Sequence, residues 1–519
     1  MPFRLYKNIC PWKSLVVILT LPLLFYGCTT SKQNTKKPNI VIIYIDDLGY
    51  GDVACYGAPD VKTPNVDFLA KNGLKFTDAH CTASTCTPSR FSLLTGTYAF
   101  RNNAAILPGD APLLIKTGSE TLPAVLQHAG YTTGIVGKWH LGLGIGTINW
   151  NTSISPGPLE VGFNYSFIIP ATTDRVPCVF VEDHNVVNLD PKDPISVSYK
   201  GRIDDEATGF TNPEKLKMKA DSQHSNTIVN GISRIGFMSG GQKARWVDED
   251  IADVMTSKAK NFITENKEKP FFLYFAVPDI HVPRAPNKRF VGSTTMGRRG
   301  DVITEMDWMT GQITKTLDSL GLSDNTLIIF TSDNGPILND GYDDGAEELI
   351  GKHKASGDFR GGKYSAFEAG TVVPTITYWP GTIKPGVSDA LFSQIDILAS
   401  LAKLTGQKLI PGTVPDSFNR LDMLLGKTDR GRDWMLEEAF TLSLREGEWK
   451  YIAPQEKRTP QWLQNKKIET GLMASPQLYN IKTDQDEKLN VANQHPDIVK
   501  RLSKKLDSIK SKSATRKNY

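Results

Sequence analysis

Continuous apolar runs alternate with helical patterns along much of the chain. After Asn39, the residues at 40–45 form a continuous apolar run, as do those at 271–277, and both runs are rich in β-branched or aromatic side chains. Such runs are typical of strands that are buried on both faces of a parallel sheet. The pattern predicts strands at 39–45, 131–138, 271–277 and 326–331, and helices at 63–73, 121–128, 251–266 and 304–320. This alternation predicts an α/β fold, with a large, mainly parallel or mixed sheet sandwiched by helices.

Two regions depart from this alternation. The residues at 145–247 are rich in Pro, Asp, Asn and Gly, with only short β-like pieces such as 178–181. We interpret them as long insertions over the sheet edge, within a catalytic domain at 38–434. From residue 435 onward, two strand-like segments surround Gly447, and an amphipathic basic helix follows. This composition predicts a smaller α+β subdomain at 435–519.

The N-terminus has the pattern of an export signal. Three basic residues precede an apolar stretch at 14–25 that is too short to span a bilayer, and Cys28 follows a glycine. We predict a signal peptide at 1–27, lipidation of Cys28 and a polar linker at 28–37; a plain secretory peptide is the alternative. The protein is therefore expected in the periplasm or at the cell surface, touching a membrane only through a lipid anchor.

Composition and charge narrow the class of function. The chain has 519 residues, of which 39% are hydrophobic and 22% charged, as in ordinary globular proteins. Removal of the leader's three basic residues takes the formal net charge from +4 to +1, which gives no reason to expect nucleic-acid binding. Cys55, Cys81, Cys86 and Cys178 are too few for disulfides to organise so long a chain.

Acidic and amide side chains follow two of the predicted strands. Asp46 and Asp47 come directly after the first strand, and Asp333 and Asn334 follow the strand at 326–331. In a parallel sheet the carboxyl ends of strands meet at one edge, where ligands bind. Oxygen ligands suit Ca²⁺ or Mg²⁺ rather than Zn²⁺. Either pair alone is more typical of a strand-end turn or helix cap, but the two together after buried strands predict a metal site.

The segment from Cys86 to Arg90, Cys-Thr-Pro-Ser-Arg, is a candidate for nucleophilic chemistry. Pro88 fits the first turn of a helix, so Cys86 is expected at a helix N-terminus, where the dipole favours anions. On its own, the cysteine would also be typical of a small apolar residue or of a disulfide partner for Cys81.

Two motifs give the chain a resemblance to a known family. The sequence CTPSRFSLLTG begins at Cys86, and Gly-Lys-Trp-His occupies 137–140. Together they resemble the signatures of the formylglycine-dependent sulfatases of the alkaline phosphatase superfamily. The resemblance runs from PNIVIIYIDDLGYGD through FTSDNG to LYNIKTDQDEKLN, which is nearly the whole mature chain. It implies an alkaline-phosphatase-like fold and the hydrolysis of sulfuric esters. It also implies a maturase that oxidises Cys86 to formylglycine (3-oxoalanine).

The resemblance also implies a role for each matching residue. A Ca²⁺ ion, or Mg²⁺, would be held by Asp46, Asp47, Asp333, Asn334 and the modified residue 86. The hydrate of residue 86 would attack sulfur, and Arg90 would anchor it. Lys138 and Lys363 would contact the sulfate, and His140 would deprotonate the second hydroxyl so that sulfate leaves. His281 would protonate the leaving alcohol.

The substrate is expected to be a sulfated glycan. The stretch GFNYSFIIPATTDRVPCVFVE is similar to relatives that act on sulfated galactose or N-acetylgalactosamine, as found in mucin and glycosaminoglycans. Asp174, Arg175, His184 and Arg360 are candidate sugar contacts, with a solvated loop as the alternative for each. Another sulfated sugar, such as 6-sulfated N-acetylglucosamine, is an alternative substrate. A phosphatase or phosphodiesterase of the same superfamily, or a carbohydrate-binding protein without catalysis, is an alternative function.

Overall fold

The computed structural model describes residues 11–12, 37–456, 459–464, 466 and 468–516. Apart from residues 11, 12 and 37, the predicted leader and linker, with Cys28, lie outside the described residues. From Lys37 onward the chain forms one compact unit. Within the described residues, no helix combines the length and the apolar character needed to cross a membrane.

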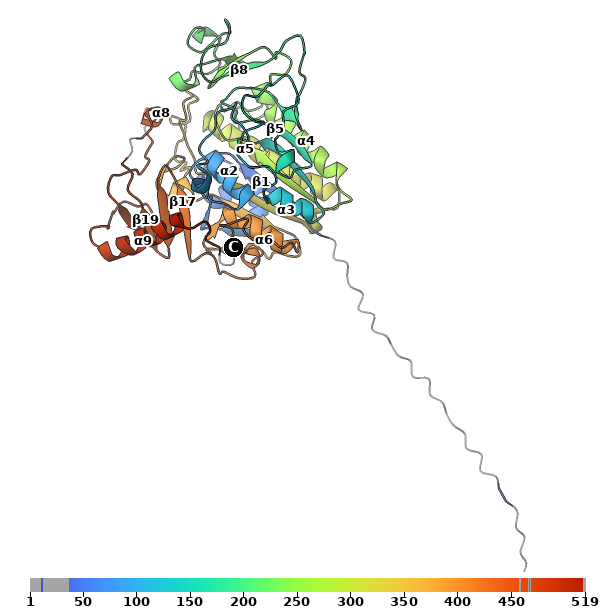
Figure 1. Ribbon diagram of the computed structural model, residues 1–519, viewed down its shortest axis with the longest axis vertical. Helices are drawn as coiled ribbons and strands as arrows, with labels where there is room; N and C mark the ends of the chain where they lie inside the picture. The colour runs from blue at the N-terminus through green and yellow to red at the C-terminus, as the bar shows by residue number, and fades with distance from the viewer. Residues whose placement is uncertain (1–10, 13–36, 457–458, 465, 467, 517–519) are drawn as a thin grey trace, which may run out of the picture. The chain divides into compact units, whose positions relative to one another are not determined.

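A ten-stranded sheet forms the centre of this unit (Figure 1). Its strands lie in the order β15-β2-β14-β13-β1-β12-β4-β5-β6-β7. Their bounds are β1 Asn39–Ile45, β2 Leu74–Phe76, β4 Thr132–Lys138, β5 Tyr165–Ile169, β6 Val181–Glu182, β7 Asn185–Val186, β12 Phe271–Val277, β13 Thr326–Ser332, β14 Thr375–Tyr378 and β15 Gly386–Ser388. The five strands from β13 to β5 are parallel, whereas β14, β6 and β7 run antiparallel to their neighbours. The prediction of a large, mainly parallel or mixed sheet is confirmed.

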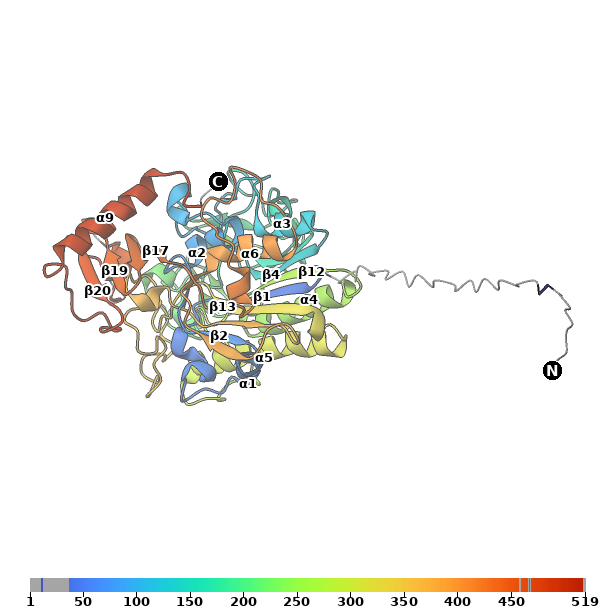
Figure 2. The same ribbon diagram turned by 90° about the horizontal axis from the view of Figure 1, so that it is seen from below.

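Burial on both faces explains why the sequence pattern predicts the central strands. Every residue of β1, β12 and β13 is buried, because helices cover both faces of the sheet. Figure 2 shows the two helical layers, with α2, α3 and α6 over one face and α1, α4 and α5 over the other. The helix bounds are α1 Pro64–Asn72, α2 Cys86–Thr95, α3 Leu122–His128, α4 Ile251–Glu265, α5 Gly297–Ser319, α6 Ile397–Leu404 and α7 Leu421–Leu424.

One helix starts earlier than predicted. The sequence pattern placed its beginning at Thr304, but α5 begins at Gly297. The added segment at 297–303 contains Arg299, which is fully buried and donates two hydrogen bonds of 2.7 Å to the carboxylate of Asp52. This long-range ion pair stabilises a Gly- and Arg-rich segment that local helical periodicity does not identify.

The polar region at 145–247 contributes more to the sheet than predicted. Its strand β5 pairs in parallel with β4 along five residue pairs and extends the central sheet. The interpretation of this region as insertions over the edge was therefore wrong for β5. β6 and β7, which also lie in this region, extend the central sheet further. Outside that sheet, β9 Ile228–Val229 and β10 Ile232–Ser233 form a short hairpin, and β8 Ser196–Ser198 pairs antiparallel with the distant β11 Phe237–Ser239. A further short pair is formed by β3 Ala79–His80 and β16 Phe392–Ser393.

The C-terminal part forms its own four-stranded antiparallel sheet, which confirms the smaller α+β element of the fold. Its elements are β17 Trp434–Glu438, β18 Leu442–Glu446, β19 Trp449–Ile452, α8 Gln461–Gln464, β20 Gln477–Asn480 and α9 Pro496–Ser511. Leu502, Leu506 and Ile509 of α9 pack in a separate hydrophobic cluster with Leu444 and Tyr451 of the sheet. The amphipathic helix predicted here therefore has an apolar stripe that contacts the sheet.

Candidate active site

Four of the five predicted metal ligands lie together at the carboxyl edge of the sheet. Asp46 and Asp47 directly follow β1, and Asp333 and Asn334 directly follow β13, the parallel neighbour of β1. The backbone N–H of Asp47 donates to Asp333 Oδ1 at 3.2 Å, and Asn334 Nδ2 donates to Asp47 Oδ1 at 2.7 Å. All four residues are fully buried. The strand register therefore brings together oxygen atoms that are almost 290 positions apart in the chain.

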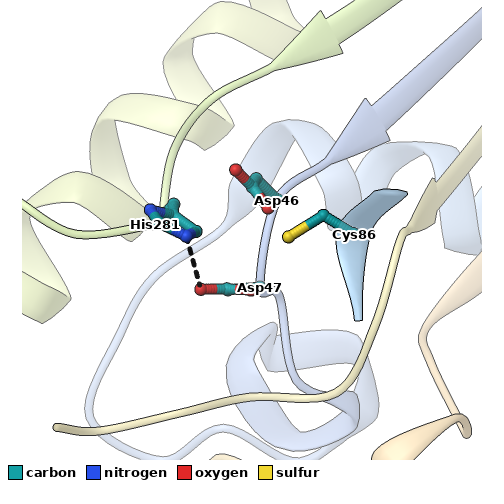
Figure 3. Close-up of side chains that lie close together, drawn as sticks. All are labelled: Asp46, Asp47, Cys86 and His281. Atoms are coloured by element: carbon teal, nitrogen blue, oxygen red, sulfur yellow. Dashed lines mark ion pairs between the residues drawn. The ribbon is translucent and has the colours of Figure 1, made fainter. Parts of the chain in front are cut away.

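Cys86 faces this group from the first residue of α2. Figure 3 shows its sulfur beside the carboxylates of Asp46 and Asp47, with His281 on the other side. One ligand atom from each of these four residues lies within 4.8 Å of those of the others. Burial raises the pKa of the Cys86 thiol to about 11, although the charges of Lys138 and Lys363 oppose the shift. The unmodified thiol is therefore protonated at neutral pH and is a poor nucleophile.

Arg90, one helical turn after Cys86, fixes one of the carboxylates. Its Nε and Nη2 atoms donate to Asp333 Oδ2 at 2.9 and 2.7 Å, and its Nη1 donates to the carbonyl of Lys138 at 3.2 Å. Burial alone would raise the pKa of Asp333, but Arg90 and Lys138 hold it below its usual range. Asp333 is therefore ionised, as a metal ligand must be.

Two buried lysines contact the remaining carboxylates. Lys138 Nζ lies 2.6 Å from Asp46 Oδ2, and Lys363 Nζ lies 2.9 Å from Asp47 Oδ2 and 3.0 Å from Asp340 Oδ2. Burial lowers the pKa of Lys363, but Asp340 and Asp47 outweigh it and raise that pKa well above its usual value. The site therefore presents a fixed ammonium group that suits an anionic ester.

Two histidines complete the cluster, and both are neutral at pH 7. Burial, and then the charge of Lys138, lowers the pKa of His140 well below its usual value. Burial and Lys363 lower the pKa of His281 to about 4. The His140 Nε2 lies 2.9 Å from the carbonyl of Leu107, while its Nδ1 is buried without a hydrogen-bond partner among the described residues. The neutral ring therefore donates from Nε2 and leaves Nδ1 as a proton acceptor.

His281 has the opposite arrangement. Its Nδ1 lies 2.6 Å from the carbonyl of Val282, so that nitrogen donates in the neutral ring. Its Nε2 points toward the cluster, 3.8 Å from Asp47 Oδ2, along the dashed line in Figure 3. His281 can therefore exchange a proton with a group bound beside Cys86.

The oxygen atoms fit a hard divalent cation. Asp46 Oδ1 and Asn334 Oδ1 are buried and make no hydrogen bond with the described residues. Buried polar atoms normally have partners, so two orphaned oxygens at one strand edge point to a group that binds there. Carboxylate and amide oxygens from Asp46, Asp47, Asp333 and Asn334 are the ligands that Ca²⁺ and Mg²⁺ prefer. The donor set therefore fits the metal that the sequence predicts.

A cavity of about 270 Å³ adjoins the cluster. Two of its lining residues contact the reactive residues directly: the Asp340 carboxylate accepts from Lys363, and the carbonyl of Leu107 lies 2.9 Å from His140 Nε2. Two of the predicted sugar contacts, Asp174 and Arg175, also line it. Apolar and aromatic side chains combined with a few charged groups, around a cavity of this size, suit a small amphipathic ligand such as a sugar.

The structure places the other two predicted sugar contacts away from this cavity. His184 Nε2 lies 2.9 Å from Glu160 Oε1, and both side chains are partly exposed. Arg360 pairs with Glu469 and lies over the ring of Phe367, 3.9 Å from its centroid. Neither belongs to the lining of the cavity that contains Asp174.

Several residues of the site were missed in the sequence. Asp340, His224 and Trp462 line the cavity, and Asp340 also contacts Lys363. Asp340 lies in an irregular loop and His224 in a polar region, so neither has a periodic or motif signal. Trp462 belongs to α8, more than 370 residues after Cys86 in the chain. Only the fold brings these three residues together.

Comparisons with known proteins agree with this geometry. A family model described as "Sulfatase" matches residues 38–407. An N-acetylgalactosamine-6-O-sulfatase of Bacteroides thetaiotaomicron is 52% identical over 92% of this chain and 94% of its own length. Human arylsulfatase A is 34% identical over 75% of this chain and 68% of its own length.

A solved structure supports the same relationship. It comes from work on the metabolism of glycosaminoglycans by Bacteroides thetaiotaomicron, and it is 52% identical to this chain. It superimposes with a TM-score of 0.90 and covers 92% of this chain and 100% of its own. The fold prediction and the prediction of an enzyme that hydrolyses sulfuric esters are confirmed. The chain belongs to the sulfatase family.

Proposed function

We propose that this sulfatase removes sulfate from a carbohydrate, and that its substrate carries a 6-sulfated N-acetylgalactosamine or galactose. One observation carries the proposal: residues that line a cavity of about 270 Å³ contact Lys363 and His140 of the buried site around Cys86. An ester group would enter the cluster while the sugar occupies the cavity. The relative that is named for N-acetylgalactosamine 6-O-sulfate, at 52% identity, supports the choice of sugar.

The proposal includes formylglycine at position 86. As its hydrate, this group would supply an oxygen nucleophile for sulfur and a second hydroxyl that allows sulfate to be released. The high pKa of the unmodified thiol supports this, because a protonated thiol at pH 7 would attack poorly. A modifying enzyme is the partner that this chemistry requires. Ca²⁺, held by the four oxygen-donating residues, would supply positive charge at the reacting oxygens.

The chain's own residues then have separate tasks. Lys138 and Lys363 bind the anionic ester and offset the charge of the carboxylates. Arg90 holds Asp333 in place. His140 accepts a proton at Nδ1, its free nitrogen. Burial lowers the pKa of His281 most, and the charge of Lys363 adds to it. An anionic sulfate beside Lys363 would offset the second cause and raise that pKa, which favours the role of His281 as the proton donor to the leaving alcohol.

Asp174 and Arg175 are proposed to bind the hydroxyl groups of the sugar. Asp174 is buried, Arg175 is partly buried, and both line the cavity. A carboxylate accepts hydrogen bonds from hydroxyls, whereas a guanidinium donates to their oxygens, so the pair recognises a hydroxyl from both sides. Such a polar pair gives orientation and specificity in a small pocket.

Export is proposed from the sequence alone. The basic, apolar and Gly-Cys pattern before residue 29 supports a leader peptide with a lipid on Cys28. Metabolic labelling with a tagged fatty acid should mark the wild-type protein and not the Cys28→Ala variant. Equal labelling of both would exclude lipidation at this position.

The function is tested by a screen of defined sulfated monosaccharides. We expect release of sulfate from N-acetylgalactosamine 6-sulfate or galactose 6-sulfate, at a kcat/KM at least about tenfold above that for the 4-sulfated sugars and N-acetylglucosamine 6-sulfate. p-Nitrophenyl phosphate is the control for the phosphatase alternative. Preferential release of phosphate, or equal rates on all sulfated sugars, would contradict the proposal.

A further inference from the structure

His224 lies between two carboxylates that come from different parts of the chain. Its Nδ1 is 2.7 Å from Asp221 Oδ1, and its Nε2 is 3.4 Å from Asp174 Oδ2. The backbone N–H of His224 also donates to Asp221 Oδ1 at 3.0 Å, and the ring packs at 4.8 Å from the ring of Tyr342. The side chain is 2% exposed. The imidazole is therefore held in a single orientation, with one nitrogen facing each acid.

The charges around the ring favour its protonated form. Burial alone would lower the pKa of His224, but the hydrogen bonds to Asp174 and Asp221 raise it above the usual value. Lys466, which contacts Asp221 and Asp340, opposes this shift. An imidazolium donates from both nitrogens, so it can hold both carboxylates at once.

The carboxylate of Asp174 has few partners, although the backbone carbonyl of this residue accepts a hydrogen bond of 2.8 Å from the N–H of Ile235. Among the described residues, its carboxylate contacts Thr172, Arg175 and His224. Thr172 and Arg175 belong to the same short loop as Asp174, so their contacts with the carboxylate are local. His224 is the contact that ties the carboxylate to another segment, the 3₁₀ turn Ser222–His224. The orientation of Asp174 in the cavity therefore depends on this imidazole.

We propose that His224 is a positioning residue that fixes the Asp174 carboxylate for sugar recognition, and so contributes to the specificity of the enzyme. This inference rests on the proposed function, because it assigns the cavity to the sugar. Among the described residues, His224 forms its hydrogen bonds, ion pairs and ring contact with Asp221, Asp174 and Tyr342, and with neither Cys86 nor the metal-ligand candidates. The proposed role is therefore in binding rather than in the chemical step.

The test compares a sugar substrate with an aryl sulfate. Loss of a hydrogen bond to a charged group weakens binding by about 10- to 100-fold. His224→Leu should raise KM for the preferred 6-sulfated sugar by at least about tenfold with kcat within about threefold. p-Nitrophenyl sulfate has no sugar hydroxyls, so its turnover should remain within about threefold of wild type. His224→Gln retains a hydrogen-bond donor, so its KM for the sugar should lie between those of His224→Leu and wild type.

A double-mutant cycle tests whether His224 acts through Asp174. Asp174→Asn should itself raise KM for the sugar, and His224→Leu added to it should raise KM by less than about twofold more. Additive effects would mean that His224 acts independently, and the proposal would be wrong. Equal losses on the sugar and the aryl sulfate would also overturn it, since they would indicate a general structural role.

Two further variants distinguish the proposed role of His224 from a general effect on folding. Asp221→Asn weakens the outer anchor of the ring at a partly exposed position, and should raise KM for the sugar by about threefold without affecting the aryl sulfate. His495→Leu removes a histidine that packs on Trp449 in the C-terminal sheet, and should leave both activities unchanged.

Failure of the proposed function and failure of the present inference give different results. If wild type hydrolyses the aryl sulfate but no sulfated sugar, the proposed function fails. If it hydrolyses the sugar and His224→Leu does so equally well, only the present inference fails.

Discussion

Arg90 and Asp333 are joined by two hydrogen bonds that converge on one carboxylate oxygen, from Nε at 2.9 Å and from Nη2 at 2.7 Å. Arg90 belongs to the helix that begins with Cys86, and Asp333 follows the strand beside β1. The pair therefore fixes the distance between the proposed nucleophile and the proposed metal ligands. Asp333 Oδ1 accepts from the backbone of Asp47, so both of its oxygens have defined partners.

Removal of this pair should destabilise the protein as well as inactivate it. Arg90→Met leaves Asp333 as a buried carboxylate without its main partner, which costs about 3 to 5 kcal/mol of unfolding free energy. Urea unfolding measures this loss. The control is Arg289→Met, which breaks an exposed pair with Asp253 and should cost less than about 1 kcal/mol. Equal losses in the two variants would contradict the assignment of Arg90 as an internal anchor.

Loss of Cys86 should affect activity alone. Cys86→Ala removes the atom that becomes the nucleophile, so sulfate release should fall below detection, while the unfolding free energy changes by no more than about 1 kcal/mol. Mass spectrometry of the wild-type peptide that contains residue 86 should show the aldehyde when a maturase is present. The matched control, Cys55→Ala, should remain active. An active protein in which residue 86 is wholly unmodified cysteine would contradict the proposed chemistry.

Calcium should stabilise the folded protein through the four oxygen-donating residues. Because the ion binds the folded state, the unfolding free energy should rise by about 2.7 kcal/mol when free Ca²⁺ is 100 times its dissociation constant. Thermal unfolding with increasing Ca²⁺, after treatment with a chelator, measures this rise. Asn334→Ala removes one ligand and should shift the response to higher Ca²⁺ concentrations. A melting temperature that is insensitive to Ca²⁺ and Mg²⁺ would exclude the site.

Stability should decrease in mildly alkaline solution because of His80. Burial alone would lower the pKa of His80, but hydrogen bonds to Asp78 and Glu437 and the charge of Glu368 raise it to about 9. A raised pKa means that folding favours the protonated form, so the contribution is complete below about pH 6.5, the ordinary pKa of histidine. It is lost as the pH rises through 9, by roughly 3 kcal/mol in total.

Urea unfolding at pH 6, 7.5 and 9 checks this dependence. In the His80→Gln variant the side chain does not titrate, so the decline between pH 6 and 9 should be much smaller. A decline of the same size in the variant and in wild type would assign it to other groups.

Much of the fold was predictable because the central strands are buried on both faces. The apolar run at 271–277 corresponds to β12 residue for residue, and the run at 39–45 to β1. Neighbouring strands end at one edge, so the pairing of Asp46 and Asp47 with Asp333 and Asn334 followed from the alternation of strands and helices. Sequence patterns carry this information because it depends only on periodicity and on chain order.

The features that were not predictable depend on contacts between distant segments. The start of α5 at Gly297 depends on an ion pair between Arg299 and Asp52, which are 247 positions apart. β5 lies in a polar, irregular region, and its pairing with β4 shows only in the folded sheet. The contact of Asp340 with Lys363 likewise joins two irregular loops that carry no periodic signal. Local helix and strand propensities carry no information about such contacts.

The burial of α2 has a consequence for the order of events in the cell. Every residue of this helix is buried, and Cys86 is 3% exposed. Another enzyme must enclose a side chain in its own active site before it can oxidise that side chain, and the folded sheet leaves no room for this. Under the proposed chemistry, residue 86 must therefore be modified while the chain is still open. A molecule that folds before the maturase acts on it would keep an unreactive thiol in an otherwise complete active site. The fraction of active enzyme would therefore depend on how fast the chain folds relative to its modification.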